Sequence, residues 1–354
     1  MMTPSRIRSA AGAADYYAKD DYYIEGEAGA PNLEWGGQGA ADLGLKGKVD
    51  AKDLRAILDG RNPDPNGPAL TDSENKAKHH AGWDFTFAVP KSVTLLVIAA
   101  EKHDPELADR LKGHVMAANK AMMSYLEANH AVTRVRDEQG AVREVQTKNL
   151  VYGSVMHVTT RGGDPHLHVH NPIANVTKNP ETGKFGALET RHMYKWQKNT
   201  SLVGARELQS RLMAEGYSIE RKGELAWEIA GTSTKLIQEF SSRSREINAG
   251  AEALAAERGV LSVSDEQRTM IQKQTRKTKG DVVREVLQKE WSERAEKVDP
   301  GALAQQVAAR TLERGQDVMA KLIGAINPAI AKLRKMVRDH NGSNARIDLY
   351  ARAT

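Results

Sequence analysis

The sequence predicts an α+β fold, in which a central antiparallel β-sheet carries helices on one side and a helical part follows towards the C-terminal end. Three observations support this prediction. Short segments between residues 83 and 229 alternate apolar and polar residues, which is the period of β-strands. Longer segments, including 104–126 and 202–215, repeat apolar residues at helical spacing. From Thr232 onward only helical patterns remain, and 354 residues are enough for one large domain or two ordinary ones.

The composition narrows the class of protein. Lys and Arg number 51 against 46 Asp and Glu, and the net charge of +5 permits a polyanionic partner without requiring one. No cysteine is present, which excludes disulfides and Cys-ligated zinc. The sequence contains neither of the glycine-rich phosphate-binding motifs, so we expect no nucleotide cofactor. No apolar run is long enough to span a bilayer and no signal peptide is visible, so we expect a cytoplasmic protein without a membrane partner.

The first cluster of reactive side chains lies near the N-terminus and consists of four tyrosines, Tyr16, Tyr17, Tyr22 and Tyr23. Tyrosines often pack in a core with the hydroxyl in water, but acidic neighbours such as Asp15 and Asp20 make a poor core. A phenol can also act as a nucleophile or stack against nucleobases. The cluster alone leaves these three interpretations open.

The next segments lead to the first predicted strand. Glycines predict a loop over 26–48, whereas 50–58 predicts a short helix and 61–68 a turn region. Strict alternation over 83–89 then predicts a strand whose apolar side chains share one face. Asp84 lies on the opposite face, where it is either a solvent-exposed residue or a functional group. Its position becomes informative if this strand lies beside the histidines described next.

A pair of alternating segments, 150–160 and 165–170, predicts a β-hairpin that turns at Gly162-Gly163. Because side chains alternate along a strand, His166, His168 and His170 share one face. A two-residue turn places His157 opposite His168, Pro165 opposite Thr160 and His166 opposite Thr159. Four imidazoles on one patch favour a metal site over a solvated polar face, with Zn or Mn expected from ligand softness. The pairing leaves either His166 or His170 as the third ligand.

The remaining elements follow in chain order. Asp104 and Pro105 predict the start of the helix over 104–126, and a hairpin turning near 137–140 follows it. The helix over 202–215 ends at Gly216, and 217–229 predicts another hairpin. The helical remainder contains basic residues beside hydroxyl groups, namely Arg243, Arg245, Arg276, Lys277 and Lys279. Such runs are usually solvated helix faces.

Together these features resemble the relaxase domain of MobF-class conjugative relaxases, members of the HUH endonuclease superfamily. The resemblance rests on the tyrosine pairs, on Asp84-Phe-Thr-Phe-Ala-Val-Pro-Lys-Ser-Val93 and on Pro165-His-Leu-His-Val-His170 together with His157. Ala174-Asn-Val-Thr177, Phe240-Ser-Ser-Arg-Ser244 and Thr275-Arg-Lys-Thr-Lys279 extend it, so that it covers about residues 1–295. It implies an RRM-like palm over 1–230 and a helical, DNA-covering part over 231–295. No motif matches the helical extension and polar tail over 296–354.

The resemblance also implies a function and a set of site residues. Such enzymes bind the plasmid origin of transfer as a hairpin and single strand, and cut one strand through a covalent 5′-phosphotyrosine. Tyr16 matches the nucleophile, Tyr22 or Tyr23 the tyrosine of the second pair, and Asp84 the acid beside the metal. His157, His168 and His170 match the ligands of one divalent ion, expected as Mg or Mn with Zn as the alternative. His166 stands where the family often has Gln.

The resemblance also implies binding partners, and it leaves alternative functions open. Expected partners are origin-of-transfer DNA, accessory proteins of the relaxosome and the coupling protein of a type IV secretion system, with translocation to the recipient cell. The same chemistry would serve a rolling-circle replication initiator or a transposase. A non-catalytic single-strand binding module and a three-His metallohydrolase, in which water replaces Tyr16, are the alternatives of other classes.

Overall fold

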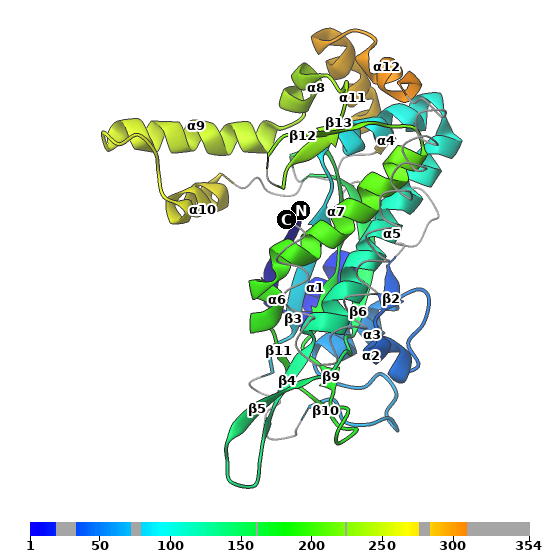
Figure 1. Cartoon of the computed structure of the whole chain (residues 1–354), viewed down its shortest axis with the longest axis vertical. Coiled ribbons are helices and arrows are strands. Elements are labelled where there is room, and N and C mark those ends of the chain that lie inside the picture. Colours follow the sequence, from blue (N-terminus) through cyan, green and yellow to red (C-terminus); the bar gives the residue numbers. More distant parts are fainter. Residues whose placement is uncertain (19–32, 72–78, 161, 224, 276–283, 310–354) are drawn as a thin grey trace, which may run out of the picture.

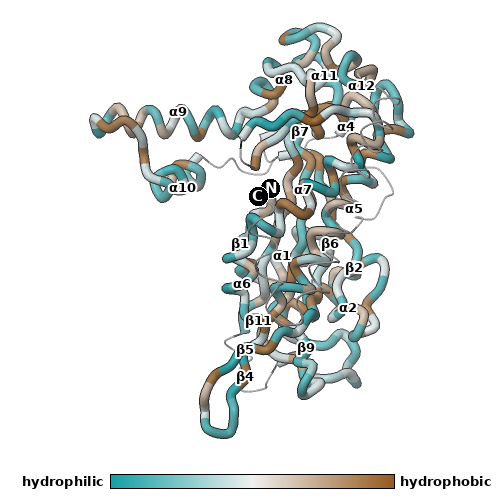
Figure 2. The backbone as a smooth tube through the Cα atoms, viewed as in Figure 1, coloured by the Kyte–Doolittle hydropathy of each residue, from teal (hydrophilic) through white to brown (hydrophobic). Residues whose placement is uncertain are grey.

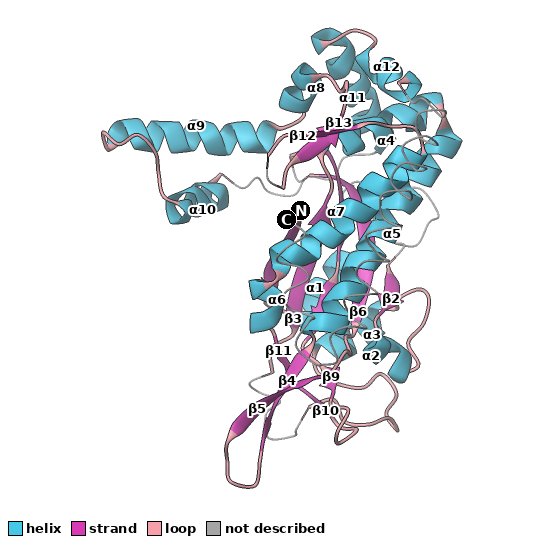
Figure 3. Cartoon of the chain, in the orientation of Figure 1, coloured by secondary structure: helices cyan, strands magenta, loops and turns pink. Residues whose placement is uncertain are grey.

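The computed structural model describes residues 1–18, 33–71, 79–160, 162–223, 225–275 and 284–309. Figures 1 and 3 show an elongated sheet with helices around it and a helical part at one end. The first half of the chain forms β1 (Met2–Ile7), α1 (Ala10–Ala18), β2 (Glu34–Gly36), α2 (Gln38–Asp42), α3 (Ala51–Leu58), β3 (Gly82–Ala88), α4 (Lys91–His103), α5 (Pro105–His130), β4 (Val132–Arg136), β5 (Val142–Gln146), β6 (Tyr152–Thr159) and β7 (Pro165–His170). The second half forms β8 (Pro172–Ala174), β9 (Thr177–Lys178), β10 (Phe185–Gly186), β11 (Leu188–Glu189), α6 (Arg191–Lys195), α7 (Gln197–Ala214), β12 (Ile219–Arg221), β13 (Trp227–Ile229), α8 (Thr234–Glu239), α9 (Ser242–Glu257), α10 (Asp265–Gln274), α11 (Arg284–Val298) and α12 (Ala302–Ala308).

The central sheet is antiparallel, as predicted, and has six strands. Five of them follow the order β1-β3-β7-β6-β2, and the sixth is β8. Strand β8 continues the line of β7 beyond Asn171 and also lies between β3 and β6. The strand that carries Asp84 is therefore the direct neighbour of the strand that carries His168 and His170. This pairing decides the position of Asp84, which the sequence alone left open.

Helices cover both faces of the sheet, so the expectation of helices on one side is wrong. On one face, Phe85, Phe87 and Val169 pack against the apolar side chains of α4, α5 and α7. Figure 2 shows hydrophobic segments where these helices meet the sheet. On the other face, Val155 and Ala174 pack against α1 and α3 in a second apolar cluster. This second cluster is possible because the strands also carry apolar residues on the face of the histidines.

Local signals explain most helix boundaries. The Asp50 and Asp104 side chains accept hydrogen bonds from the first turns of α3 and α5, as expected of N-caps. Gly216, at φ 92°, follows the end of α7. Helix α7 begins at Gln197, earlier than the predicted 202. The β4–β5 and β12–β13 hairpins lie where the sequence predicted them.

The expectation of a loop throughout 26–48 is wrong for the part that the structure describes. Strand β2 forms there because Trp35 pairs with Gly153 at the edge of the sheet. Gly37, at φ 92°, links β2 to α2, and a Cβ on it would lie 2.2 Å from the Leu150 carbonyl oxygen. Glycine is therefore required by the close approach of two backbones.

The helical part packs on the sheet domain through α4. Leu95 of α4 shares an apolar cluster with Leu236, Phe240 and Trp291 of α8 and α11. Helix α12 also lies against α4, where Gln306 Nε2 donates a hydrogen bond of 2.8 Å to the Ser92 carbonyl oxygen. Figure 1 shows α9 and α10 projecting away from this body. Among the described residues, no helix combines the length and apolar character needed to cross a bilayer.

Candidate metal and tyrosine site

Strands β6 and β7 bring three histidines together. His157 lies directly opposite His168 in the ladder, as predicted, and His170 projects from β7 to the same side. One ring nitrogen from each of the three lies within 4.8 Å of those of the other two, and all three residues are buried. His157, His168 and His170 therefore form a group that can hold a metal ion, hereafter the histidine triad.

The hydrogen bonds of the triad leave ring nitrogens that fit an ion. His170 Nδ1 lies 2.6 Å from Asp84 Oδ2, while its Nε2 is buried with no hydrogen-bond partner among the described residues. His168 Nδ1 lies 2.8 Å from the carbonyl oxygen of His166, which leaves Nε2 for a ligand. Burial and the nearby His170 lower the pKa of His168 to about 4, so the ring is neutral near pH 7. Neutral imidazoles oriented through their other nitrogen are the form that binds metals.

Asp84 is a buried carboxylate held from several sides. Besides His170, it accepts hydrogen bonds from Thr86 Oγ1 and from the Asn171 backbone N–H, both at 3.1 Å. The Tyr17 hydroxyl donates to it as well. Burial raises the pKa of the Asp84 carboxyl, but the charge of His170 and these hydrogen bonds together bring it below its ordinary value. Asp84 is therefore ionised and orients the His170 ring.

Helix α1 presents its two tyrosines to the triad in different environments. The Tyr16 ring is half-buried, and its centroid lies 5.7 Å from that of His170 and 6.2 Å from that of His157. Tyr17 is buried, and burial together with the negative charge of Asp84 raises the pKa of its hydroxyl well above the ordinary range. Tyr17 is thus the weaker candidate for a nucleophile, and its hydroxyl is engaged by Asp84.

The hairpin turn differs from the predicted one. The Thr160 N–H donates to the Asp164 carbonyl oxygen, and Gly163, at φ 83°, donates to Thr160, so the loop is one residue longer than a two-residue turn. Pro165 therefore lies opposite Thr159, and the predicted pairings of Pro165 with Thr160 and of His166 with Thr159 are wrong. An irregularity between His157 and Thr159 shifts the register back, which explains why the His157–His168 pair was still predicted correctly.

His166 lies outside the triad. Its ring stacks on that of His168 at a centroid distance of 5.2 Å and an interplanar angle of 24°. Burial lowers the pKa of His166 well below its ordinary value, with the charges of His168 and Lys91 acting in the same direction. His170, rather than His166, completes the compact group with His157 and His168.

Two predicted DNA-contacting arginines make internal contacts on α9. Arg243 Nη1 donates to the carbonyl oxygen and the hydroxyl of Thr275, at 2.7 and 2.8 Å. Arg245 Nη1 donates to the Gln238 carbonyl oxygen at 2.5 Å. These bonds link α9 to the end of α10 and to α8. Tyr22, Tyr23, Arg276, Lys277 and Lys279 lie outside the described residues.

Sequence reasoning did not single out three residues close to the triad. Thr86 and Asn171 hold Asp84, and Lys91 Nζ donates to the Pro165 carbonyl oxygen at 2.7 Å. Burial lowers the pKa of Lys91 to about 8, against the opposing charges of Asp164 and Glu228. Thr86 stands two residues after Asp84 on the same strand face, so period-2 alternation could have identified it.

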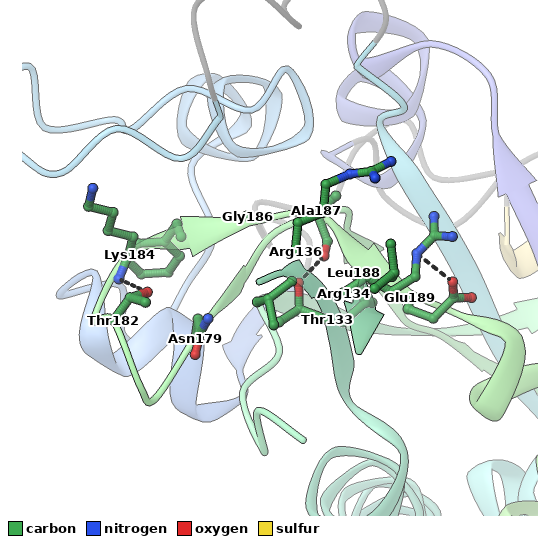
Figure 4. A pocket seen from close by; sticks show the side chains of 13 residues that line it. Thr133, Arg134, Arg136, Asn179, Thr182, Lys184, Gly186, Ala187, Leu188 and Glu189 are labelled. Carbon is green, nitrogen blue, oxygen red and sulfur yellow. Dashed lines mark hydrogen bonds and ion pairs between the residues drawn. The ribbon is translucent and has the colours of Figure 1, made fainter. Parts of the chain in front are cut away.

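A separate pocket of about 420 Å³ lies between β4 and the β9–β10 region. Figure 4 shows that polar groups in it pair with one another. Thr133 Oγ1 donates to the Ala187 carbonyl oxygen at 2.8 Å, and Arg134 Nε lies 3.0 Å from Glu189. None of the predicted site residues lines this pocket.

Comparison with known proteins shows which family the chain resembles. The multifunctional conjugation protein TraI of Escherichia coli is 34% identical over 305 residues, which are 82% of this chain and 16% of TraI. TraI of strain K12 is 33% identical over the same length, so the chain spans about a sixth of these relatives.

Solved structures of the conjugative relaxase TrwC are also similar. A copper-bound complex with oriT DNA has a TM-score of 0.72 at 30% identity, covering 84% of this chain and 98% of the chain in that structure. A complex with a 27-mer comprising the recognition hairpin and the cleavage site has a TM-score of 0.71 with the same identity and coverage. The model of the TrwC relaxase family matches residues 10–298, a span that includes α1, Asp84 and the histidine triad. This chain belongs to the TrwC relaxase family.

Proposed function

We propose that this chain is a site- and strand-specific DNA transesterase. It nicks single-stranded origin-of-transfer DNA through a covalent 5′-phosphotyrosine, rejoins it, and thereby initiates conjugative transfer. The observation that carries the proposal is the position of Tyr16 beside the histidine triad. Support also comes from the relatives, since TrwC was solved with oriT DNA that includes a recognition hairpin and a cleavage site.

The reaction assigned to Tyr16 is a transfer of one phosphodiester bond. The Tyr16 hydroxyl oxygen forms a bond to the scissile phosphorus while the bond from phosphorus to the 3′-oxygen breaks. The phenol loses its proton and the departing 3′-hydroxyl gains one, so the step is balanced without a cofactor being consumed. The phosphotyrosine keeps the ester bond, and the reverse attack by a 3′-hydroxyl rejoins the strand without ATP.

The other residues position the reacting groups. A divalent ion held by His157, His168 and His170 would polarise the scissile phosphate and stabilise the charge that develops on it. Asp84 fixes the His170 ring, and the Tyr17 hydroxyl donates to Asp84. We propose Mg or Mn as the ion in use, as the family resemblance implies, with Zn, which imidazole ligands suit better, as the alternative.

Further roles belong to the same proposal. Tyr22 and Tyr23 would serve a second transfer step, and Arg243, Arg245, Arg276, Lys277 and Lys279 would contact DNA phosphates. The palm is assigned to 1–230, the DNA-covering part to 231–295 and the extension to 296–354. Relaxosome accessory proteins and a secretion coupling protein are the proposed protein partners, in the bacterial cytoplasm and with passage to the recipient.

The rival activities predict different products. A metallohydrolase would use water in place of Tyr16 and leave no protein–DNA adduct. A non-catalytic binding module would leave the DNA uncut. Family membership favours a relaxase over a replication initiator or transposase of the same chemistry.

The test is covalent capture of a labelled single-stranded origin oligonucleotide by Tyr16→Phe and Tyr17→Phe variants. We expect Tyr16→Phe to abolish the adduct and to change DNA affinity by less than about tenfold, since the hydroxyl contributes at most about 1.4 kcal/mol to binding. Tyr17→Phe, the matched control from the same helix, should retain the adduct at a reduced rate. A full yield of adduct from Tyr16→Phe would refute the assignment, and loss in Tyr17→Phe alone would move it to Tyr17.

A further inference from the structure

The hydrogen bonding between β3 and the β7–β8 line is irregular at Asn171. In a regular hydrogen-bonded pair of antiparallel strands, two opposite residues exchange both backbone bonds. The Phe85 N–H donates to the Asn171 carbonyl oxygen at 3.0 Å, which is the first of these bonds. The return bond to the Phe85 carbonyl oxygen comes from the Asn171 side chain, whose Nδ2 lies 2.7 Å away. The Asn171 side chain therefore takes the place of its own backbone N–H in the ladder.

The backbone N–H that is released in this way donates to the metal-side carboxylate. Asn171 N lies 3.1 Å from Asp84 Oδ1, while the other carboxylate oxygen, Oδ2, faces His170 Nδ1 at 2.6 Å. The two oxygens of Asp84 are thus held by the main chain on one side and the triad on the other. An Asp84 fixed at both oxygens holds the His170 ring in one orientation.

The Asn171 amide is itself fixed by two buried side chains on the opposite face of the sheet. Asn119 of α5 forms a reciprocal pair with it, in which Asn119 Nδ2 donates to Asn171 Oδ1 and Asn171 Nδ2 donates to Asn119 Oδ1, both at 2.9 Å. The Ser154 hydroxyl of β6 donates to Asn171 Oδ1 at 2.6 Å. All three residues are buried, Asn171 completely. A buried polar group is costly unless it is satisfied, and here every bond of the amide has a partner.

We propose that Asn171 is a positioning residue for the metal site, which acts through Asp84 and is braced by Asn119 and Ser154. The inference rests on the proposed metal-binding role of the triad. Without the Asn171 amide, the backbone N–H would return to the Phe85 carbonyl oxygen and Asp84 would lose one of its donors. The His170 ring would then be less firmly oriented for an ion. Outer hydrogen-bond partners of metal ligands typically contribute 10–100-fold to metal affinity.

The test is the affinity of the DNA-free protein for Mn²⁺ and Zn²⁺, measured by calorimetry beside thermal unfolding in the absence of metal. We expect Asn171→Ala to weaken metal binding at least tenfold. Thr177→Val is the matched control, because Thr177 is equally buried and hydrogen-bonds Thr147 and the Asn149 carbonyl oxygen, away from the triad. It should lower thermal stability and leave metal affinity unchanged. Metal affinity within twofold of wild type in Asn171→Ala would overturn the proposal.

A double-mutant cycle separates positioning from general damage to the fold. If Asn171 acts through Asp84, Asn171→Ala should change metal affinity little in an Asp84→Ala background, although it weakens binding in the wild type. Equal effects in both backgrounds would overturn the proposal. If Asn171→Ala does not fold, Asn119→Ala serves instead, because it removes one hydrogen-bond partner of the Asn171 amide and leaves Asn171 in place. It should weaken metal binding by a smaller factor, and an unchanged metal affinity would count against the proposal. Wild-type protein that binds no metal would instead refute the metal site, and the inference with it.

Discussion

At the scale of single residues, His166 and His170 lie on the same face of β7 but have different surroundings. The His170 Nδ1 is bound to a carboxylate and its Nε2 points into the triad without a partner among the described residues. The His166 ring stacks on His168 and its backbone carbonyl accepts from the His168 ring. His166 therefore supports a ligand from outside, whereas His170 is placed as a ligand.

We expect His170→Ala to lose metal binding and DNA cleavage together, because the variant removes both a ligand and the partner of Asp84. His166→Gln should keep both properties, since its backbone carbonyl still orients His168. Titration with Mn²⁺ and a cleavage assay of each variant provide the measurement. The opposite pattern, in which His166→Gln loses the ion and His170→Ala keeps it, would make His157, His166 and His168 the ligand set.

His130, the last residue of α5, predicts a pH dependence of stability. Its ring stacks parallel to Trp196, and burial together with the charge of His192 lowers its pKa from 6.5 to about 4. Between these values the unfolded chain binds a proton that the folded protein does not, so stability falls as the pH falls from 6.5 to about 4. His130→Gln should reduce that loss by on the order of 1 kcal/mol, since solvent partly screens the site.

Urea unfolding at pH 7, 5.5 and 4.5 measures this effect. His103→Gln, which replaces an exposed histidine at the end of α4, serves as the control and should follow the wild type. Parallel pH profiles for wild type and His130→Gln would show that His130 is not held neutral.

At the scale of elements, Arg243 of α9 and Arg268 of α10 form hydrogen bonds between the two helices, and Arg243 makes most of them. Arg243 donates to the backbone and hydroxyl of Thr275, just beyond α10. Arg243→Lys keeps the charge but lacks the planar fork, whose second nitrogen, Nη2, donates to the Gln272 carbonyl oxygen in α10. We expect α10 to open more easily by about 1 kcal/mol, or roughly fivefold faster amide exchange over Asp265–Gln274.

Hydrogen–deuterium exchange measures this prediction against a matched variant. Arg245→Lys leaves the α9–α10 contact in place, because Arg245 donates to Gln238 and Ser242 instead. It should leave exchange in α10 unchanged. Unaltered exchange in Arg243→Lys would mean that the remaining contacts, such as the hydrogen bond from Arg268 to Asn248, are enough to hold α10.

The elements also show how far the sequence alone could lead. Period-2 alternation was sufficient for the β6–β7 hairpin and for the facing of Asp84, because side-chain alternation is a property of any strand. The turn was predicted one residue too short, and the irregularity after His157 was not visible in the sequence. Strand β1, which contains Pro4, was not predicted, since a proline disfavours a strand except at a sheet edge. The exchange of donors at Asn171 depends on the three-dimensional pairing of β3 with β7 and could not be read from spacing.

At the scale of the whole molecule, the candidate metal site joins three segments that are separate in the sequence. The triad belongs to the hairpin, Asp84 to the neighbouring strand β3, and Tyr16 to α1, which packs on the sheet through the second apolar cluster. The turn of the hairpin is in turn held by α11, since Trp291 Nε1 donates to the Gly163 carbonyl oxygen at 2.7 Å. Binding of an ion should therefore stabilise the fold as a whole.

We expect removal of the ion to lower the free energy of unfolding. At a metal concentration a hundred times the dissociation constant, the loss is about 2.7 kcal/mol. Thermal unfolding with added Mn²⁺ and with a chelator measures it. His157→Ala should show no difference between the two conditions. His114→Ala, which removes the contact of His114 on α5 with Glu215 at the end of α7, should respond like wild type. An equal response of His157→Ala would place the ion elsewhere.

The placement of all three triad histidines on one hairpin has a consequence for the order of folding. Contacts between residues close in sequence form early because closing a short loop costs little entropy. Asp84 and Tyr16 belong to segments that lie far before the hairpin in the sequence, and the Asp84–His170 contact spans 86 positions. A chain that refolds should regain a weak ion-binding hairpin first and the docked tyrosine last. Tyr16, the proposed nucleophile, would then be the final part to arrive, and a partly folded chain would be expected to hold metal without cutting DNA.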